Sequence, residues 1–271
     1  MLAGIGWAVL IFVVIDAHGA AERITQRLQA ATGREIVLNA DDASVSLWPS
    51  PRVAYPNFAI AGAGAEPAFL QADTLQVVLG WGGLGADAKP AGITLKQAEL
   101  NAAMGEAAPN WRFQGSGGEL SSYLVDVPIR LENATLRYAY GVRTTEVADA
   151  NAELQWTAGG QVTFDGQSAN GLRMKGQAEA VDLTSADTAS MPLTLELAQD
   201  TWAVNLDGAV ANPTQRFRFE GTATLKADNV AAMLAGEAAG DMPAASLQAQ
   251  GALVAVPSAW QWQQVGVTST G

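Results

Sequence analysis

The sequence contains no cysteine and a single histidine, His18. Without cysteine the chain has no disulfide, no thiolate nucleophile and no thiolate ligand for zinc. One histidine is too few for the usual histidine-based triads or for a histidine-rich metal site. These two absences argue against an enzyme, and we expect neither a catalytic residue, a cofactor nor a bound metal.

Positive charge is also scarce. The 15 lysines and arginines stand against 27 aspartates and glutamates, so the formal net charge is −12. Because a phosphate backbone requires clustered positive charge, this balance argues against nucleic-acid binding. Charged residues make up only 15% of the chain and hydrophobic residues 49%, which is typical of a folded domain with a sizeable core.

The N-terminus carries an apolar run, Leu2–Ile15, without one charged residue. As a helix it would be about 21 Å long, short of the hydrocarbon core of about 30 Å. A longer span would include Asp16 and His18, which a membrane tolerates only near the headgroups. Two interpretations remain open: a single transmembrane anchor over residues 1–17, or the apolar region of a cleaved signal peptide. No positive charge precedes the run, which favours the anchor.

Small side chains on the predicted anchor suggest a further role. Gly4 and Ala8 are four residues apart, so they share one helix face and would let another helix approach closely. The alternative function is therefore a non-catalytic accessory subunit that docks through this helix onto a larger inner-membrane complex. We expect the membrane-facing and helix-packing side chains to be Gly4, Trp7, Ala8, Ile11, Phe12 and Ile15.

A short amphipathic helix is predicted over residues 18–33. Ile24, Leu28 and Ala31 recur at helical spacing, and Gly33 stands where a helix commonly ends in a left-handed residue. A second short helix of about two turns is predicted from Asp228 to Gly236, because a capping residue precedes an apolar stretch and a glycine follows it.

From residue 34 onward the apolar period changes to two, which is typical of half-buried strands. Glycine-containing pairs that are typical of tight turns separate these patterns: Gly159-Gly160, Asp165-Gly166, Asn170-Gly171 and Asp207-Gly208. Strands without intervening helices favour an antiparallel sheet. The alternating stretches are 44–47, 75–77, 193–197, 202–206 and 216–220.

We therefore predict a mainly β domain over residues 34–271, as an open groove or a sandwich. Strand patterns at 260–262 and 265–267 continue almost to Gly271. We expect this sheet to continue in a longer chain, so that the domain is incomplete at its C-terminus, or to pair with another element.

Two motifs near the start of this domain resemble the opening of AsmA-like proteins. Thr32, Gly33 and Arg34 lead from the predicted helix into a strand, and Leu47, Trp48 and Pro49 form an aromatic-proline turn before the next strand. Weaker matches follow at 127–138 and 220–234, so the resemblance spans nearly the whole chain. AsmA-like proteins are commonly longer and often carry basic residues before the anchor.

The resemblance implies a single-pass protein of the bacterial inner membrane with its β domain in the periplasm. AsmA-like and TamB-like proteins are thought to form a long curved sheet whose apolar inner face shields acyl chains. The implied partner is phospholipid or another acyl lipid, and the implied role is phospholipid transport or outer-membrane assembly.

Overall fold

The structure is a computed structural model that describes residues 17–62, 67–79, 89–104, 109–113, 115, 124–158, 160–179, 190–212, 218–229, 245–256 and 259–270. It is mainly β, as the two-residue period predicts. One helix, α2 (Ala17–Thr32), precedes the strands. The strands are β1 (Ile36–Val37), β2 (Ser44–Ser46), β3 (Arg52–Ile60), β4 (Leu70–Leu79), β5 (Pro90–Met104), β6 (Pro128–Tyr140), β7 (Arg143–Trp156), β8 (Gln161–Gln167), β9 (Arg173–Glu179), β10 (Ser190–Gln199), β11 (Trp202–Ala211), β12 (Arg218–Ala227), β13 (Ser246–Val256) and β14 (Ala259–Thr270).

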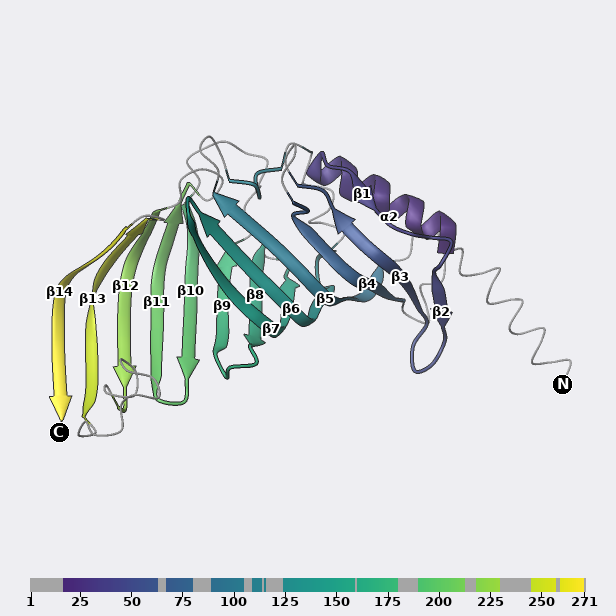
Figure 1. Ribbon diagram of the computed structural model, residues 1–271. Coiled ribbons are helices and arrows are strands. Elements are labelled where there is room, and N and C mark those ends of the chain that lie inside the picture. The colour runs from purple at the N-terminus through teal and green to yellow at the C-terminus, as the bar shows by residue number, and fades with distance from the viewer. Residues whose placement is uncertain are drawn as a thin grey trace, which may run out of the picture.

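All of these strands belong to one sheet. From β3 to β14 each strand pairs with its neighbour in sequence, while β1 and β2 both pair with β3. The sheet curves from β2 beside α2 to β14 at the opposite end and does not close on itself (Figure 1). The described strands thus form the open sheet of the two predicted alternatives and not a sandwich.

One strand pair departs from the predicted antiparallel order. β5 and β6 run parallel, with Ile93 opposite Ile129 and Met104 opposite Tyr140. The prediction of a wholly antiparallel sheet is wrong at this point, because residues 105–127 lie between the two strands. A connection of that length reaches back to the starting edge of the sheet, whereas a hairpin turn cannot.

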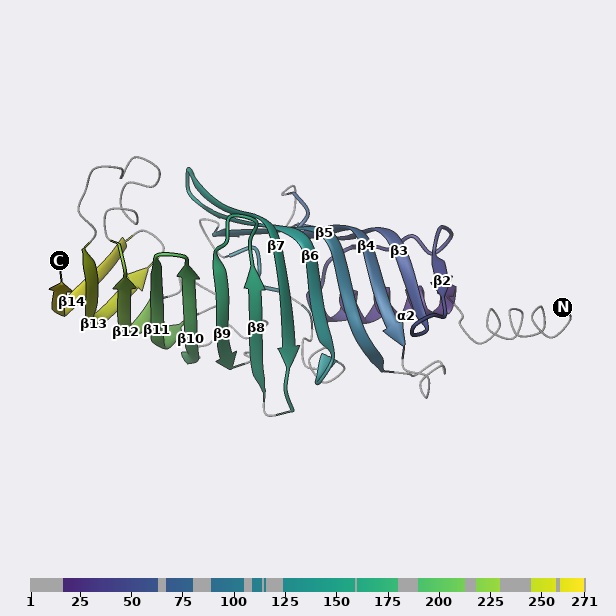
Figure 2. The ribbon, with the colours of Figure 1, turned by 90° about the horizontal axis from the view of Figure 1, so that it is seen from below.

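The predicted helix over 18–33 is present as α2, which packs on the sheet at the β3–β5 end (Figures 1 and 2). Ala21, Ile24 and Leu28 contact the same core cluster as Tyr55 and Phe58. The Tyr55 hydroxyl donates a hydrogen bond of 3.0 Å to the carbonyl of Ala17, the first helical residue. The buried stripe of α2 therefore covers one end of the sheet.

The predicted anchor and the predicted second helix lie mostly outside the described residues. Residues 1–16, which include every side chain proposed for the anchor, and residues 230–244 are not described. Within the described ranges, no helix combines the length and the apolar character needed to cross a bilayer.

Five neighbouring strands, β3 to β7, each contain one extra residue at the same level of the sheet. Asn57, Gln97, Asn133 and Asp149 adopt positive φ angles of 56°, 48°, 53° and 50°. In β4 the extra residue is Asp73, which lies at the level of Asn57 and Gln97, between the paired residues Ala72 and Thr74. Such β-bulges bend a strand and increase its twist. Because all five strands are bulged together, the sheet bends without losing its pairing.

Alanines adjoin this line of bulges on the side of the sheet that α2 covers. Ala72, Ala98, Ala134 and Ala150 are 5%, 2%, 0% and 0% exposed. Ala72 is paired with Ala98 and Ala134 with Ala150. Small side chains fit where the bend brings neighbouring strands and their side chains together.

The register keeps apolar residues on one side of the whole sheet. One row of twelve residues, one from each strand from β3 to β14, crosses the sheet on this side. Each residue of the row is the cross-strand partner of the next, and none of the twelve is polar. We call this side the apolar face and the opposite side the polar face. The row contains Tyr55, Leu75, Leu95, Leu131, Ala152, Gly166, Met174, Leu197, Val204, Leu225, Ala249 and Val267.

Two of the predicted turns are wrong. Asp165-Gly166 lies within β8 and Asp207-Gly208 within β11, both in the middle of continuous pairing. Asn170-Gly171, with Gly171 at a φ of 82°, forms the predicted turn between β8 and β9, and Gly160, at a φ of 76°, lies in the predicted turn between β7 and β8, whose Gly159 is outside the described residues. A Cβ on Gly208 would lie 2.3 Å from the carbonyl oxygen of Glu220. Close approach of the backbones, not a turn, accounts for this glycine.

Gly208→Ala is expected to destabilise the domain by about 1–3 kcal/mol, because backbone atoms of β12 must shift to admit the new methyl group. The matched control is Gly92→Ala in β5, where the nearest heavy atom, Cγ of Pro128, would be 3.7 Å away. Denaturant unfolding followed by circular dichroism measures both variants. Equal stability of the two would contradict the assignment of Gly208 to a close backbone contact.

Candidate functional site

The apolar face is the candidate functional site of this structure. At the β3–β5 end it forms the buried core beneath α2. Among the described residues, no helix or second sheet lies over the face from β7 to β14. There the apolar side chains of β10 and β11, such as Leu195 and Leu206, are only partly buried, by their neighbours in the same sheet. Beyond β6 this face therefore has no second layer among the described residues.

Aromatic rings lie over glycines on this face. A Cβ on Gly176 would meet the ring of Phe164 at 2.5 Å, and one on Gly221 would meet the ring of Phe219 at 2.8 Å. The indole of Trp262 occupies the same position over Gly251. Glycine leaves the pleat bare, and the neighbouring ring shields the backbone in its place. The face is thus smooth and apolar where a row of larger side chains would be uneven.

A cavity lies between α2 and the apolar face of β3 to β6. Its volume is about 160 Å³, and its lining is almost entirely apolar. Ile24, Arg27 and Leu28 contribute from α2, and Leu95 and Ile129 contribute from β5 and β6. The cavity extends the uncovered apolar face a short way beneath the helix.

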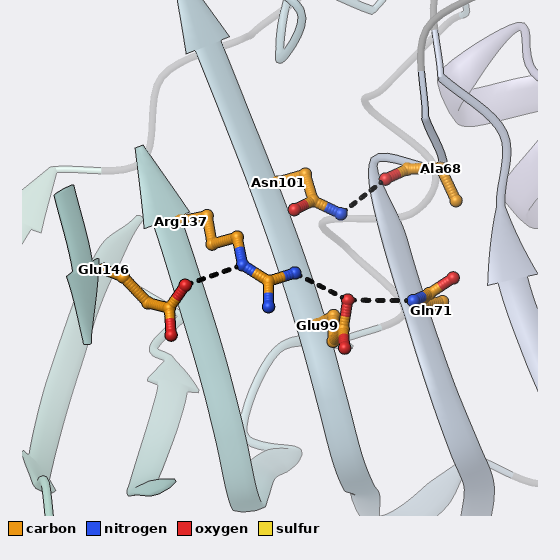
Figure 3. Close-up of polar contacts among 6 residues, drawn as sticks. All are labelled: Ala68, Gln71, Glu99, Asn101, Arg137 and Glu146. Carbon is orange, nitrogen blue, oxygen red and sulfur yellow. Dashed lines mark hydrogen bonds and ion pairs between the residues drawn. The ribbon is translucent and has the colours of Figure 1, made fainter. Parts of the chain in front are cut away.

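The polar face carries chains of ion pairs. Arg137 in β6 donates to Glu99 at 2.8 Å on one side and to Glu146 at 2.9 Å on the other, and Gln71 donates to Glu99 at 2.9 Å (Figure 3). The hydrogen bonds to Glu146 and Glu99 raise the pKa of Arg137 further above its ordinary value. Because these groups are largely solvated, they define the water-facing side more than they stabilise the sheet.

A shallow hollow of about 580 Å³ lies on the polar face across β7–β11. Glu153, Asp165, Glu196 and Asp207 line it, together with Lys175. Lys175 lies 3.8 Å from Asp165. In the part of the chain that the structure describes, no three acidic or histidine side chains are grouped so as to hold a metal ion. Side chains of both charge signs therefore line this hollow, which is open to water.

The structure places the motif Thr32-Gly33-Arg34 at the junction between α2 and the sheet. The Thr32 hydroxyl donates to the Leu28 carbonyl at 2.7 Å, and Gly33 has a φ of 67°, so the helix ends here. Arg34 then contacts two aromatic rings, with its guanidinium carbon 5.3 Å from the centroid of Phe69 and 4.8 Å from that of Phe113, and the two rings contact each other edge to face. This motif fixes how the helix lies on the sheet.

The same arginine ties down the segment 109–113. Its guanidinium donates to the carbonyl of Ala61 at 3.2 Å and to that of Asn110. Asn110 is 6% exposed and both donates to Asn101 and accepts from Ala103 of β5. Sequence analysis missed Phe69, Asn110 and Phe113, because partners 35 to 79 residues away from Arg34 leave no periodic signal.

The second motif, Leu47-Trp48-Pro49, lies elsewhere in the structure. Leu47 packs against the core cluster, but Trp48 is 82% exposed in the turn between β2 and β3, with a cis peptide bond to Pro49. The Trp48 carbonyl accepts a hydrogen bond of 3.1 Å from Arg52. The structure therefore does not bring Leu47, Trp48 and Pro49 together with the junction formed by residues 32–34.

No family model, no curated protein and no solved structure matches this chain. The candidate site is accordingly defined by its own geometry: an uncovered apolar face, a cavity at its covered end, and a water-facing side that carries the charge.

Arg34→Lys is expected to destabilise the junction by about 1–2 kcal/mol, because lysine cannot contact both rings and also make the paired hydrogen bonds to Ala61 and Asn110. Hydrogen exchange of the amides in residues 109–113 and at the end of α2 measures the effect. The control is Arg173→Lys, at an exposed position at the start of β9. Unchanged protection in Arg34→Lys would show that the contacts with Phe69 and Phe113 do not hold this junction.

Proposed function

We propose that this chain is a membrane-anchored, AsmA-like periplasmic protein that binds lipid acyl chains along its apolar face. In this proposal it contributes to phospholipid transport or to outer-membrane assembly. The observation that carries the proposal is the unbroken row of apolar residues from Tyr55 to Val267, uncovered by any described helix or strand beyond β6. No catalytic group is required, since transfer of a lipid breaks no bond.

The dimensions of the face support this proposal. From β7 to β14 there are seven steps between neighbouring strands, and at about 4.8 Å a step they span about 34 Å. One leaflet of a bilayer holds its acyl chains within about 15 Å, half of the hydrocarbon core. The uncovered face is thus longer than one acyl chain.

The energetics point the same way. Burial of an acyl chain is favourable by about 0.8 kcal/mol per methylene, so a chain of about sixteen carbons gains on the order of 10 kcal/mol. Losses of ligand freedom reduce this figure. An uncovered apolar face is itself unfavourable in water, so a bound chain stabilises protein and ligand together.

The covered end gives the face a direction in this proposal. α2 blocks the apolar face at β3–β5, and the cavity beneath Ile24 and Leu28 accepts only the end of a chain. A lipid would therefore lie with its headgroup over the more open strands. The predicted anchor over residues 1–17 leads directly into α2, which would place the covered end next to the bilayer.

Leu206→Asp is expected to remove bound lipid, because it introduces a carboxylate into the apolar face of β11. The matched control is Asn205→Asp, the adjacent residue, whose side chain is exposed on the polar face. The expected result is at least a tenfold lower ratio of copurified phospholipid to protein in Leu206→Asp, and an unchanged ratio in Asn205→Asp. Mass spectrometry of the extracted lipid measures the ratio.

The outcome that would contradict the proposal is equal lipid content in both variants or no lipid in the unmodified protein. Circular dichroism of the two variants checks that each is folded. A lipid-free protein that instead copurifies with an integral-membrane complex, and loses it in Ala8→Ile, would favour the accessory role.

The proposed orientation has its own test. Alkaline phosphatase fused after residue 271 is expected to be active in intact cells, because the enzyme folds to its active form only in the oxidising periplasm. A β-galactosidase fusion at the same position is expected to be inactive. The reverse pair of activities would place the sheet in the cytoplasm.

A further inference from the structure

The turn between β2 and β3 holds a tryptophan out of the protein. Trp48 is 82% exposed, whereas Leu47 before it packs against the core cluster and Pro51 after it is fully buried. The Trp48 carbonyl accepts hydrogen bonds from the Ser46 hydroxyl at 3.4 Å and from Arg52 at 3.1 Å. The turn is therefore fixed to the sheet on both sides, and the ring is not exposed merely because its loop is loose.

This ring is the most exposed aromatic side chain among the described residues. An indole combines a large apolar body with one polar N–H group, so it is suited to a boundary between water and an apolar medium. For this reason tryptophan is enriched where membrane proteins cross the headgroup level of a bilayer. The exposure of Trp48 thus suggests an interfacial role, provided that the turn lies next to a membrane.

The position of α2 places the turn next to the predicted anchor. Near the start of β3, Tyr55 donates to the carbonyl of Ala17, the first residue of α2. Just past the end of the helix, Arg34 donates to the carbonyl of Ala61, just past the end of β3. The helix therefore runs beside β3 in the same direction. The chain enters α2 from the edge of the sheet at which β3 begins, and the Trp48 turn lies at that edge (Figure 1).

The charges around the turn suit a lipid headgroup layer. Residues 47–51 carry no charge, and the first charged residue after them is Arg52. Because Arg52 donates to the Trp48 carbonyl, its guanidinium lies beside the turn, where it can pair with a lipid phosphate. The nearest acidic residues along the chain, Asp41 and Asp42, belong to the preceding loop. An anionic surface gives a chain of net charge −12 no advantage, so the contact depends on the ring and on one arginine.

We propose that Trp48 inserts into the headgroup region of the bilayer that holds the predicted anchor, as a second point of attachment beside the start of α2. This inference rests on the proposed function, in which residues 1–17 cross the membrane. The partner is the lipid surface itself: the indole occupies the interface, and Arg52 pairs with phosphate. A single anchor leaves the domain free to turn about it, whereas two points of attachment fix which edge of the sheet faces the bilayer.

The opposite edge of the sheet provides an internal reference. β5 and β6 both begin at the edge where β3 begins. The 13 residues of β6 cover about 43 Å along the strand. Val142, in the turn that follows β6, is fully exposed. In this proposal Val142 stays in water while Trp48 contacts lipid.

Site-specific fluorescence tests this contact, because the chain has no cysteine and a single introduced one can carry an environment-sensitive probe. Ser50→Cys places the probe two residues from Trp48 and leaves the ring intact, and Val142→Cys places it at the opposite edge. The full chain is reconstituted into vesicles of phosphatidylethanolamine and phosphatidylcholine. Nitroxides on the lipid headgroups are expected to quench the probe at position 50 about fivefold more strongly than the probe at position 142. Iodide on both sides of the membrane is expected to show the reverse order.

The matched variant adds Trp48→Ala to the Ser50→Cys chain. The exposed ring contributes little to the core, so the variant is expected to fold, and circular dichroism checks this. Quenching of the probe at position 50 by the lipid nitroxides is expected to fall to the level of position 142, because the turn has lost the side chain that holds it in the interface.

Flotation of the vesicles separates this inference from the proposed function. A chain that does not float with the vesicles contradicts the anchor, and the inference with it. A chain that floats but shows equal quenching at positions 50 and 142, or unchanged quenching in Trp48→Ala, overturns the Trp48 contact alone. A probe that is shielded from iodide but not quenched by the lipid nitroxides also overturns it, because protein and not lipid then covers the turn.

Discussion

The structure depends on one constraint: in every strand, the apolar side chains must fall on the same side of a single sheet. Strand side chains alternate, so one inserted residue would move all later apolar residues to the wrong side. In β3–β7 the chain inserts a residue in five strands at one level and keeps the apolar face intact on both sides of it. In these strands the aligned bulges therefore allow the sheet to bend while its apolar residues stay on one side.

Glycine and aromatic residues serve the same constraint further along the sheet. Gly176, Gly221 and Gly251 occupy positions on the apolar face where a neighbouring ring takes the space of a side chain. Gly208 faces Gly221 directly, and a Cβ on either would meet the backbone of the other strand. Together with the bulges, these residues let a sheet of great width twist and curve while its strands remain paired.

The sequence was a good guide where structure is local. The helix over 18–33, its end at Thr32 and Gly33, and the alternating strands all follow from period and from turn chemistry. The alternation of apolar and polar residues was not enough to predict the parallel pairing of β5 with β6. The relative direction of these two strands depends on the long connection between them, residues 105–127. Asp165-Gly166 and Asp207-Gly208 have the composition of turns, yet long-range pairing places both within strands.

In the candidate site, too, local features could be predicted from the sequence and features that depend on distant residues could not. The apolar face could be predicted as a property of each strand, but not that the row would continue unbroken through twelve strands, since this requires the register of every pair. The role of Arg34 rests on two aromatic rings that are distant in sequence. The motif residues Thr32, Gly33 and Arg34 could be singled out, while what they hold in place could not.

A sheet of one layer has a consequence for how this molecule unfolds. Each strand from β6 onward gains its contacts almost entirely from the two strands beside it, as a repeat does in a solenoid protein. Stability then accumulates step by step from nearest neighbours, and local opening spreads inward from a free end. The part beneath α2 has a second layer, so we expect it to be the last to open. Strands far from it are the first to open, and whatever occupies their apolar side acts as the missing layer of the core.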